Sequence, residues 1–488
     1  MNSIESLREA CAGVTPLTAR LEPWQEELLG DPASLNRLVD QYGSPLNLLQ
    51  PELLHRNLGE LNNIAQQHNL NLQVFFARKA NKCVSLVEAA LAAGIGLDVA
   101  SHEELRQSLA LGAQPGKLIL TAAIKDQKLI ELAVSNNVCI AIDNADEAQL
   151  VREVAQALDT RAIVALRLSG FQFHGEKLFS RFGVDIDQFE KFVERDLDST
   201  FEENPLLLKG LHFHLDGYDY RQRVAALEQC LEVSDRLKQF GHSLEFIDMG
   251  GGFPMSYLDS AAQWEAFWGE LHRALLGERE PITYQNHALG LGVNAGKIVG
   301  TPNVYPSVHQ HDTSQWLANV FKSQAFDGKE TIAQAITARG LQLRCEPGRA
   351  MLNGSGMTVA RVAYVKQHPA GHHLIGLSMN NTQCRTMHDD FLIDPLLVRV
   401  SESGKPNGEP ISGYLTGAYC TESELLTWRR LNFPLGISPG DLVVWPNTAG
   451  YFMHFRESRS HQFPLAKNLV IEEQEFELDL IDRPESLR

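Results

Sequence analysis

The sequence predicts an α/β fold, a TIM barrel followed by a C-terminal antiparallel β domain. Two observations carry this prediction. Between about residues 72 and 346, helix-like or irregular stretches separate eight short apolar runs, which are LQVFFA, IGLDVA, LILTA, VCIAID, AIVALRL, KGLHFHL, LEFIDMG and LQLRCEP. After Arg349, longer β-like runs follow without regular helices. Eight strand–helix units are the repeat of a TIM barrel, and the second pattern is typical of a separate β domain.

The residues ahead of the barrel predict two further elements. Residues 1–42 are polar and helix-like, which indicates an N-terminal helical extension. The run YGSPLNLLQ opens with turn residues, so we expect a strand at 43–50. A helix separates this strand from the first barrel strand, and we therefore assign it to the later β domain at 350–488. Both ends of the chain are then expected to meet in that domain.

The barrel is expected at 51–349. The segment SHEELRQSLALGA shows the helix signals between its strands, because Ser101 and Glu104 have the spacing of a capping box. The stretch at about 277–339 is irregular and long for a connection inside a compact barrel. We interpret it as an insertion, with a lid as one possible role.

Composition excludes several classes of protein. The chain has 488 residues, 44% hydrophobic and 21% charged, enough for more than one buried core. Its net charge of −18, without a block of Lys and Arg, speaks against nucleic-acid or anionic-membrane partners. No apolar stretch has the length of a membrane span and the start lacks a signal pattern, so we expect a cytoplasmic location.

Cysteine and histidine positions give no sign of a metal centre. The seven cysteines are scattered without C-x-x-C spacing, so reduced thiols are expected rather than disulfides or structural zinc. The pairs His309/His311 and His372/His373 lack acidic partners at a recognisable helical spacing. No metal is therefore expected.

Polar residues stand where six of the eight predicted strands end. The carboxyl ends of barrel strands are where TIM-barrel active sites lie. For a single residue, a salt bridge at the rim explains the position equally well, but the set predicts a site. Its members are Lys79, Asp98, Arg167, His212, His214, Gly250, Gly251, Gly252 and Glu346.

Seven further segments are distinctive in their order and spacing along nearly the whole chain. They are YGSPLNLL, FFARKANK, GLDVASHEEL, GLHFH, IDMGGGFP, EPGRAML and GAYCTESELL. In these segments the chain resembles the diaminopimelate, ornithine and arginine decarboxylases, the fold-type III pyridoxal-phosphate enzymes. The resemblance implies an alanine-racemase-like barrel with a β domain and pyridoxal 5′-phosphate as cofactor. It also implies decarboxylation of an amino acid by a homodimer whose active sites are built from both subunits.

The resemblance assigns the groups around the cofactor ring. Lys79 carries the cofactor as a Schiff base, and Lys82 is its nearby competitor. Glu346 in EPGR resembles the carboxylate that keeps the ring nitrogen protonated, so that the ring becomes a better electron sink. His214 resembles the histidine that stacks on the ring, while His212 is either packing or a supporting partner.

Asp98 and Arg167 resemble residues that orient Lys79 and Glu346, with a structural salt bridge as the rival interpretation. The cofactor phosphate needs unobstructed backbone amides, which Gly250, Gly251 and Gly252 can supply. Arg349 and Tyr451 are expected to add a charge and a hydroxyl. The Tyr451 match is looser, because the family's Gly-Ala-Tyr appears here as Ala449-Gly450-Tyr451.

On the substrate side, Cys420 resembles the residue of the partner subunit that delivers a proton to Cα. By its number of positions after Cys420, Glu424 matches the acidic residue that contacts the substrate in the family. Arg385 stands where diaminopimelate enzymes bind a distal carboxylate. Asp216-Gly217 replaces the family's Gly-Ser, which puts one phosphate contact in doubt. With the insertion, these departures leave open a diaminopimelate-like acid, another diamino acid or a siderophore-type intermediate as substrate.

Two other functions use the same fold. A racemase or epimerase needs a second acid/base and tends not to protonate the ring nitrogen, so Glu346 argues against it. A noncatalytic regulator related to the decarboxylases would be expected to lose Lys79 or Cys420, and both are present.

Overall fold

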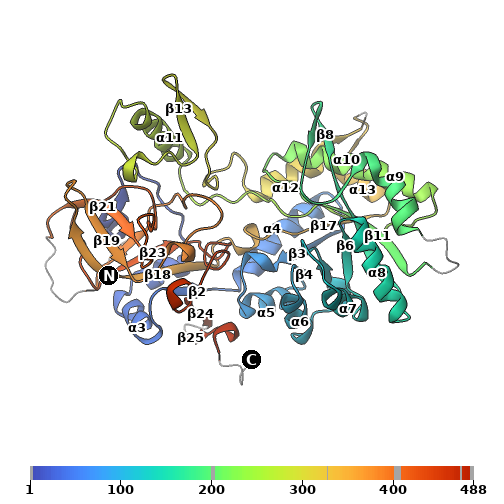
Figure 1. Cartoon of the computed structure of the whole chain (residues 1–488), viewed down its shortest axis with the longest axis horizontal. Coiled ribbons are helices and arrows are strands. Elements are labelled where there is room, and N and C mark those ends of the chain that lie inside the picture. The colour runs from blue at the N-terminus through green and yellow to red at the C-terminus, as the bar shows by residue number, and fades with distance from the viewer. Residues whose placement is uncertain (1–3, 199–203, 327, 401–407, 473–474, 484–488) are drawn as a thin grey trace.

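The computed structural model describes residues 4–198, 204–326, 328–400, 408–472 and 475–483. A barrel and a β domain lie side by side along the long axis of the molecule (Figure 1). The helices of the described residues include none that is long and apolar enough to cross a membrane.

Eight parallel strands close into the barrel, because β17 pairs with β3 at one side and β6 pairs with β7 at the other. They are the eight runs predicted from the sequence, so the predicted TIM barrel is confirmed. In spatial order the strands are β7 (Ala162–Ser169), β11 (Leu206–Phe213), β12 (Phe246–Asp248), β17 (Gln342–Cys345), β3 (Leu72–Ala77), β4 (Gly96–Val99), β5 (Leu118–Leu120) and β6 (Cys139–Ile142).

Helices cover the outside of the barrel: α4 (Leu53–Gln67), α5 (Val84–Ala92), α6 (His102–Ala110), α7 (Gln127–Ser135), α8 (Ala145–Ala157), α9 (Phe189–Phe192), α10 (Tyr220–Gln239), α12 (Thr313–Lys322) and α13 (Ile332–Ala338). Ser101 caps α6 by accepting from the Glu104 amide, as its position predicted. The Glu104 carboxylate accepts from the Ala100 amide instead of closing the box.

The barrel interior is packed at the amino ends of its strands. The Phe246 ring fills the space beside Gly210, where an added Cβ would lie 2.3 Å from the ring. The Arg344 guanidinium covers the same ring at 3.6 Å from its centroid. Because this end is filled, inward-pointing polar side chains further along the strands face the opposite end of the barrel.

Several short strands lie next to the barrel strands or in the loops between them. They are the hairpin β8 (Phe171–Phe173) and β9 (Glu176–Leu178), the strand β10 (Val184–Asp185) beside β7, and the pair β15 (Gln324–Ala325) and β16 (Glu330–Thr331).

The second domain is a mostly antiparallel sheet, as predicted. Its strand order is β1-β22-β21-β19-β18-β2-β24-β25, with β23 joining β18 to β20. The bounds are β1 (Ala12–Gly13), β2 (Leu46–Leu49), β18 (Gly356–Gln367), β19 (His373–Leu377), β20 (Leu396–Val398), β21 (Ile411–Thr416), β22 (Leu431–Phe433), β23 (Leu442–Pro446), β24 (Lys467–Glu472) and β25 (Glu475–Leu478).

The N-terminal strand β2 pairs with β18 and β24, so it belongs to this domain, as expected from the sequence. The extension before it forms α1 (Ile4–Ala10), α2 (Pro23–Leu29) and α3 (Pro32–Tyr42), whose apolar residues share a core with β2, β18 and β23. It also contributes β1, which the sequence did not predict and which pairs with β22.

The expected insertion at about 277–339 has two different halves. The first half, up to residue 312, is part of a segment that begins earlier than predicted, at residue 254. This segment 254–312 contains α11 (Ala261–Leu275), β13 (Leu291–Asn294) and β14 (Lys297–Gly300) and shares a core with the β domain. Figure 1 shows α11 and β13 above that domain, apart from the barrel. Residues 313–338 instead hold α12 and α13, and α12 packs against α4 and α10 of the barrel. This second half is helical rather than irregular, with caps at Asp312 and Thr331.

Candidate active site

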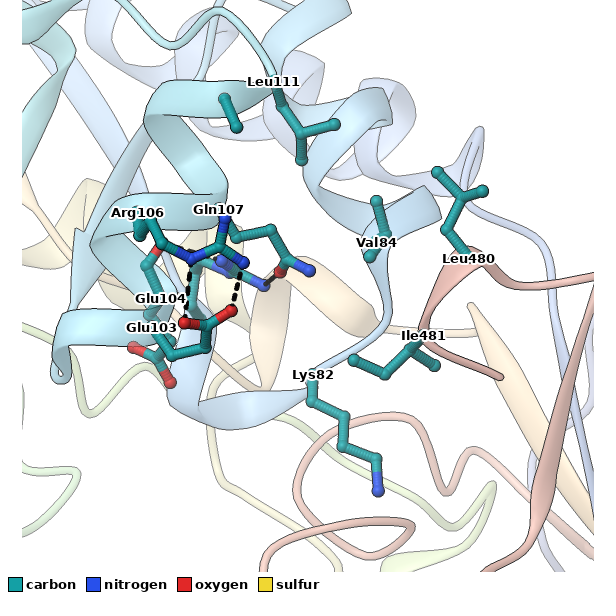
Figure 2. A pocket seen from close by; sticks show the side chains of 11 residues that line it. Lys82, Val84, Glu103, Glu104, Arg106, Gln107, Leu111, Leu480 and Ile481 are labelled. Carbon is teal, nitrogen blue, oxygen red and sulfur yellow. Dashed lines mark hydrogen bonds and ion pairs between the residues drawn. The ribbon is translucent and has the colours of Figure 1, made fainter. Parts of the chain in front are cut away.

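Among the hollows that the described residues form, two are candidates for the active site. The larger, of about 700 Å³, lies on the outside of the barrel between α6, the start of α5 and the segment at Leu480. Figure 2 shows Arg106 bonded to Glu103 on one side of it, with Val84 and Leu480 on the other. Its charged groups are thus engaged with protein partners.

The smaller hollow, of about 230 Å³, lies at the carboxyl ends of the barrel strands, where the β domain meets the barrel. Residues of both domains line it, including Lys79, His214, Gly251, Gly252, Glu346, Arg349, Thr386, His388 and Tyr451. Most of the predicted strand-end residues are in this group, so we place the candidate site here.

Lys79 lies directly after β3, on the turn Arg78–Ala80. The neighbouring strand β4 brings Asp98 beside it, and Lys79 Nζ donates to Asp98 Oδ2 over 3.3 Å. The hydroxyl of Thr121 donates to the other oxygen of Asp98 and so fixes the carboxylate. The negative charge of Asp98 raises the pKa of Lys79 above its ordinary value, so the amine is protonated at rest.

The competitor Lys82 points elsewhere. Its amine pairs with Glu457 at 2.7 Å and lines the larger hollow on the outside of the barrel. The β domain also holds the Lys79 turn in place, because the Tyr451 amide donates to the Ala80 carbonyl over 2.8 Å.

Glu346 follows β17 and is buried in contact with His212. His212 Nε2 lies 3.0 Å from Glu346 Oε1. Burial and the nearby Arg167 charge lower the pKa of His212 well below its ordinary value, so the ring is neutral and we assign the proton to Nε2. Burial raises the pKa of Glu346, while Lys79 and Arg167 oppose that shift. His212 therefore supports Glu346 rather than serving only as packing.

Asp248 is a site residue that the sequence interpretation missed, although it lies in the quoted run FIDM. Adjacent strands place it next to His212, and polar atoms of His212, Asp248 and Glu346 lie within 4.8 Å of one another. Its Oδ1 accepts from the Gly250 amide, and its Oδ2 is buried with no hydrogen-bond partner among the described residues. Burial and the neighbouring Glu346 raise its pKa well above the ordinary value.

Arg167 occupies the strand position beside His212. Its guanidinium lies 3.7 Å from Asp143 and 4.2 Å from the centre of the Phe182 ring. Its ion pair is thus with Asp143, which the sequence interpretation did not single out. Arg167 acts on Glu346 and His212 through its charge rather than through a hydrogen bond.

The glycine run 250–252 passes closely between the strand ends. A Cβ on Gly250 would lie 2.5 Å from the Phe213 carbonyl oxygen, and one on Gly251 would lie 2.7 Å from that of Glu346. Gly250 and Gly252 also have positive φ, +65° and +82°. A larger residue at Gly250 would displace the backbone of Phe213, and one at Gly251 would displace the backbone of Glu346.

His214 and Tyr451 complete the wall. Burial and the Lys79 charge lower the pKa of His214, which leaves an uncharged ring at the edge of the cavity. The Tyr451 hydroxyl packs over Gly348, where an added Cβ would lie 2.5 Å from the hydroxyl oxygen. Asp216 and Gly217, which replace the family's Gly-Ser, also line the cavity.

The three predicted substrate-side residues lie outside the cavity lining of their own chain. Cys420 is exposed. Arg385 is buried, donates to the Leu425 carbonyl and lies over Trp428. Glu424 accepts from the Asn381 amide over 2.7 Å, and burial raises its pKa to about 7. Instead, the neighbouring Thr386, Met387 and His388 line the cavity.

Known proteins are similar to this chain in sequence and in fold. Residues 58–296 match the family described as pyridoxal-dependent decarboxylase, pyridoxal binding domain. The uncharacterized protein y4yA of Sinorhizobium fredii is 31% identical over 444 residues, which are 90% of this chain and 91% of that protein. This chain belongs to the pyridoxal-phosphate-dependent decarboxylase family.

More distant relatives also match the chain, one in sequence and one in fold. Diaminopimelate decarboxylase of Staphylococcus aureus is 24% identical over 436 residues, 87% of this chain and 88% of the enzyme. The structure of diaminopimelate decarboxylase from M. jannaschii in complex with L-lysine has a TM-score of 0.67 at 16% identity, covering 91% of each chain, which shows the shared fold.

The cofactor of the family is pyridoxal phosphate, as the sequence resemblance implied. The residues present fit this group. The cavity offers an amine at Lys79, a buried carboxylate at Glu346 and a glycine run that no side chain obstructs. Arg349 adds a positive charge, and its hydrogen-bond partners among the described residues are the neutral Tyr257 hydroxyl and Gly450 carbonyl.

Proposed function

We propose that the protein decarboxylates an amino acid at this cavity, with Lys79 holding the cofactor. The observation that carries the proposal is that the Lys79 amine and the buried Glu346 carboxylate face one cavity beside the glycine run. Pyridoxal phosphate, when bound, supplies the electron sink that accepts the electrons of the broken bond. The roles below are those of the chain's own residues.

Lys79 supplies the nucleophilic amine, and Asp98 and Thr121 orient it. Glu346 holds a proton at the ring nitrogen, which makes the ring a better electron acceptor. His212 donates to Glu346 and so keeps the carboxylate in position. The neutral ring of His214 is suited to stacking on the cofactor, since it adds no charge there.

Backbone amides of Gly251 and Gly252 take the phosphate, with Arg349 and the Tyr451 hydroxyl beside them. The Gly250 amide, expected from the sequence to join them, donates to Asp248 Oδ1 instead. The exposed large apolar side chains support a second copy over the mouth of the barrel. Ile124, in the loop after β5, is 85% exposed, and Phe179, after β9, is 79% exposed.

We propose a homodimer in which Cys420 of a second copy delivers the proton to Cα, because Cys420 lies outside its own cavity lining. Two inactive variants, Lys79→Ala and Cys420→Ala, test this sharing. Mixing them is expected to restore activity, since a mixed dimer has one site with both residues intact. Two variants that stay inactive after mixing, while wild-type subunits demonstrably exchange, would contradict it.

The proposed substrate is a diaminopimelate-like or other diamino acid, or a siderophore-type intermediate. Support comes from Glu424 and Arg385, which lie close to each other in the β domain and would face the partner's site with Cys420. The test presents diaminopimelate, lysine, ornithine and arginine and records carbon dioxide release together with exchange of the α-proton. Release supports decarboxylation. Exchange without release favours the racemase alternative. Inactivity of the cofactor-loaded protein on all four contradicts the diaminopimelate and common diamino acid substrates, and inactivity on a siderophore-type amino acid as well favours a noncatalytic regulator.

A further inference from the structure

Arg349 is the cation of the cavity that lacks a carboxylate partner. Its Nη1 donates to the Tyr257 hydroxyl over 2.8 Å and to the Gly450 carbonyl over 3.0 Å. Within the described ranges, no carboxylate forms an ion pair with it, although Lys79 and Arg167 each face one. Both partners of Arg349 are neutral, so its positive charge is not cancelled.

Aromatic rings surround the guanidinium. The centroid of Tyr305 lies 4.0 Å from its central carbon, and the rings of Phe452, Tyr451 and Tyr257 lie at 4.9, 5.0 and 5.9 Å. Ring faces attract a cation without using its N–H donors, whereas a carboxylate would occupy them. Nη1 is engaged by Tyr257 and Gly450, so the N–H donors of Nε and Nη2 stay available for an oxyanion in the cavity.

Tyr305 is itself held firmly. Its hydroxyl lies 3.1 Å from the Met255 amide and 3.2 Å from the Met255 carbonyl, and His309 Nε2 lies 3.1 Å away. Burial and the Arg349 charge lower the pKa of His309 to about 4, so this ring is neutral too. Tyr305 and Tyr257 are nearly fully buried and meet edge to face at 5.5 Å.

Both tyrosines come from segment 254–312, which shares its core with the β domain. The segment thus reaches from the β domain to the cavity and forms the wall behind Arg349. Of the two tyrosines only Tyr305 lies in the expected insertion at about 277–339, and it connects the first part of that insertion to the site.

We propose that Tyr257 and Tyr305 are positioning residues that hold Arg349, with its charge unneutralised, for an oxyanion in the cavity. That oxyanion is the cofactor phosphate or the substrate carboxylate, so the inference rests on the proposed function. A desolvated cation–π contact corresponds to roughly 30-fold in an equilibrium constant. Removing the Tyr305 ring should therefore weaken binding of the anion by about that factor.

The test compares ligands that differ only in the anion. Tyr305→Leu is expected to weaken pyridoxal phosphate roughly 30-fold and to leave pyridoxal, which lacks the phosphate, unchanged, both measured by absorbance titration of the apoprotein. The readout is the ratio of the affinities for pyridoxal phosphate and pyridoxal. Tyr305→Phe keeps the ring and should retain most of this ratio. Tyr414→Leu is the matched control, since Tyr414 is a buried tyrosine of the β domain whose hydroxyl contacts Thr283 instead.

A second arm detects the substrate carboxylate. In the cofactor-loaded protein, binding of lysine is compared with that of cadaverine, which lacks the carboxylate. A loss for lysine alone assigns Arg349 to the substrate, and a loss for pyridoxal phosphate alone assigns it to the cofactor. In an Arg349→Gln background, Tyr305→Leu should change neither ratio further.

The inference is overturned if Tyr305→Leu leaves both ratios unchanged, or if Tyr414→Leu changes them equally. Wild-type protein that still binds pyridoxal phosphate at Lys79 confines that failure to the tyrosines. Wild-type protein that binds no pyridoxal phosphate contradicts the proposed function and this inference together.

Discussion

Replacing Asp98 by asparagine removes the charge that faces the Lys79 amine while keeping the shape of the side chain. Lys79 Nζ and Asp98 Oδ2 lie 3.3 Å apart, and the Asp98 charge is the largest cause of the raised pKa of Lys79. The variant should therefore lower the pKa of the amine and make the nucleophilic form available at lower pH.

The distance sets the size of the effect. Two unit charges 3.3 Å apart attract by about 1 kcal/mol at the dielectric constant of water and by about 5 kcal/mol at an effective value near 20. The Lys79 side chain is 39% exposed, so solvent screening brings the interaction below the upper figure. At about 1.4 kcal/mol per pKa unit, the expected decrease is roughly one to three units.

The assay measures how fast apoprotein captures pyridoxal phosphate, by absorbance, across a series of pH values. The midpoint of the profile should move to lower pH by about one unit or more in Asp98→Asn. Glu457→Gln is the matched control, because it removes the carboxylate 2.7 Å from Lys82. Identical profiles for Asp98→Asn and wild type, or an equal shift in the control, would refute the reasoning.

Three further predictions follow from packing and charge. Gly251→Ala puts a Cβ 2.7 Å from the Glu346 carbonyl oxygen, so we expect about 1–3 kcal/mol lower stability in denaturant unfolding and weaker cofactor binding by titration. Phe246→Ala should lower the free energy of unfolding by about 3–5 kcal/mol in denaturant unfolding. It leaves a cavity in the barrel and removes the ring that lies under Arg344. Burial raises the pKa of Glu424 from its ordinary 4.5 to about 7 in the native protein. Between these values the native protein keeps a proton that the unfolded chain releases, so the free energy of unfolding falls as pH rises through this window. Glu424→Gln should abolish that fall in thermal melts.

Each of these predictions has a contradicting result. Gly251→Ala with wild-type cofactor affinity would show that the run tolerates side chains. Phe246→Ala with wild-type stability would mean that the ring is not part of the packed barrel end. A Glu424→Gln protein whose stability still falls between pH 4.5 and 7 as steeply as that of wild type would assign the dependence to another group.

The sequence predicted the barrel well because each strand is a short apolar run, and the site because six of the eight runs end at polar residues or glycines. Lys79, Glu346 and the glycine run could be located from that pattern and from the family motifs. The two-residue β1 is too short to leave a periodic signal. Helix α12 was taken for insertion because the segment before it is irregular.

The rest of the site depends on side-chain directions that the β domain decides. Arg385 stands at the expected place in the sequence, yet its guanidinium turns to the Leu425 carbonyl. Tyr257 and Tyr305 belong to none of the quoted motifs, and the fold of segment 254–312 brings them to Arg349. Asp248 was missed because a carboxylate inside an apolar run gives no signal of its direction. The cytoplasmic location and the dimer stay predictions.

The most direct test of the account is to determine which lysine holds the cofactor. Protein loaded with pyridoxal phosphate is reduced with borohydride, digested, and its peptides are analysed by mass spectrometry. We predict a pyridoxyl group on Lys79 and its loss in Lys79→Ala, with Lys82 unmodified. A pyridoxyl group on Lys82 or on any other lysine of wild-type protein would contradict the account.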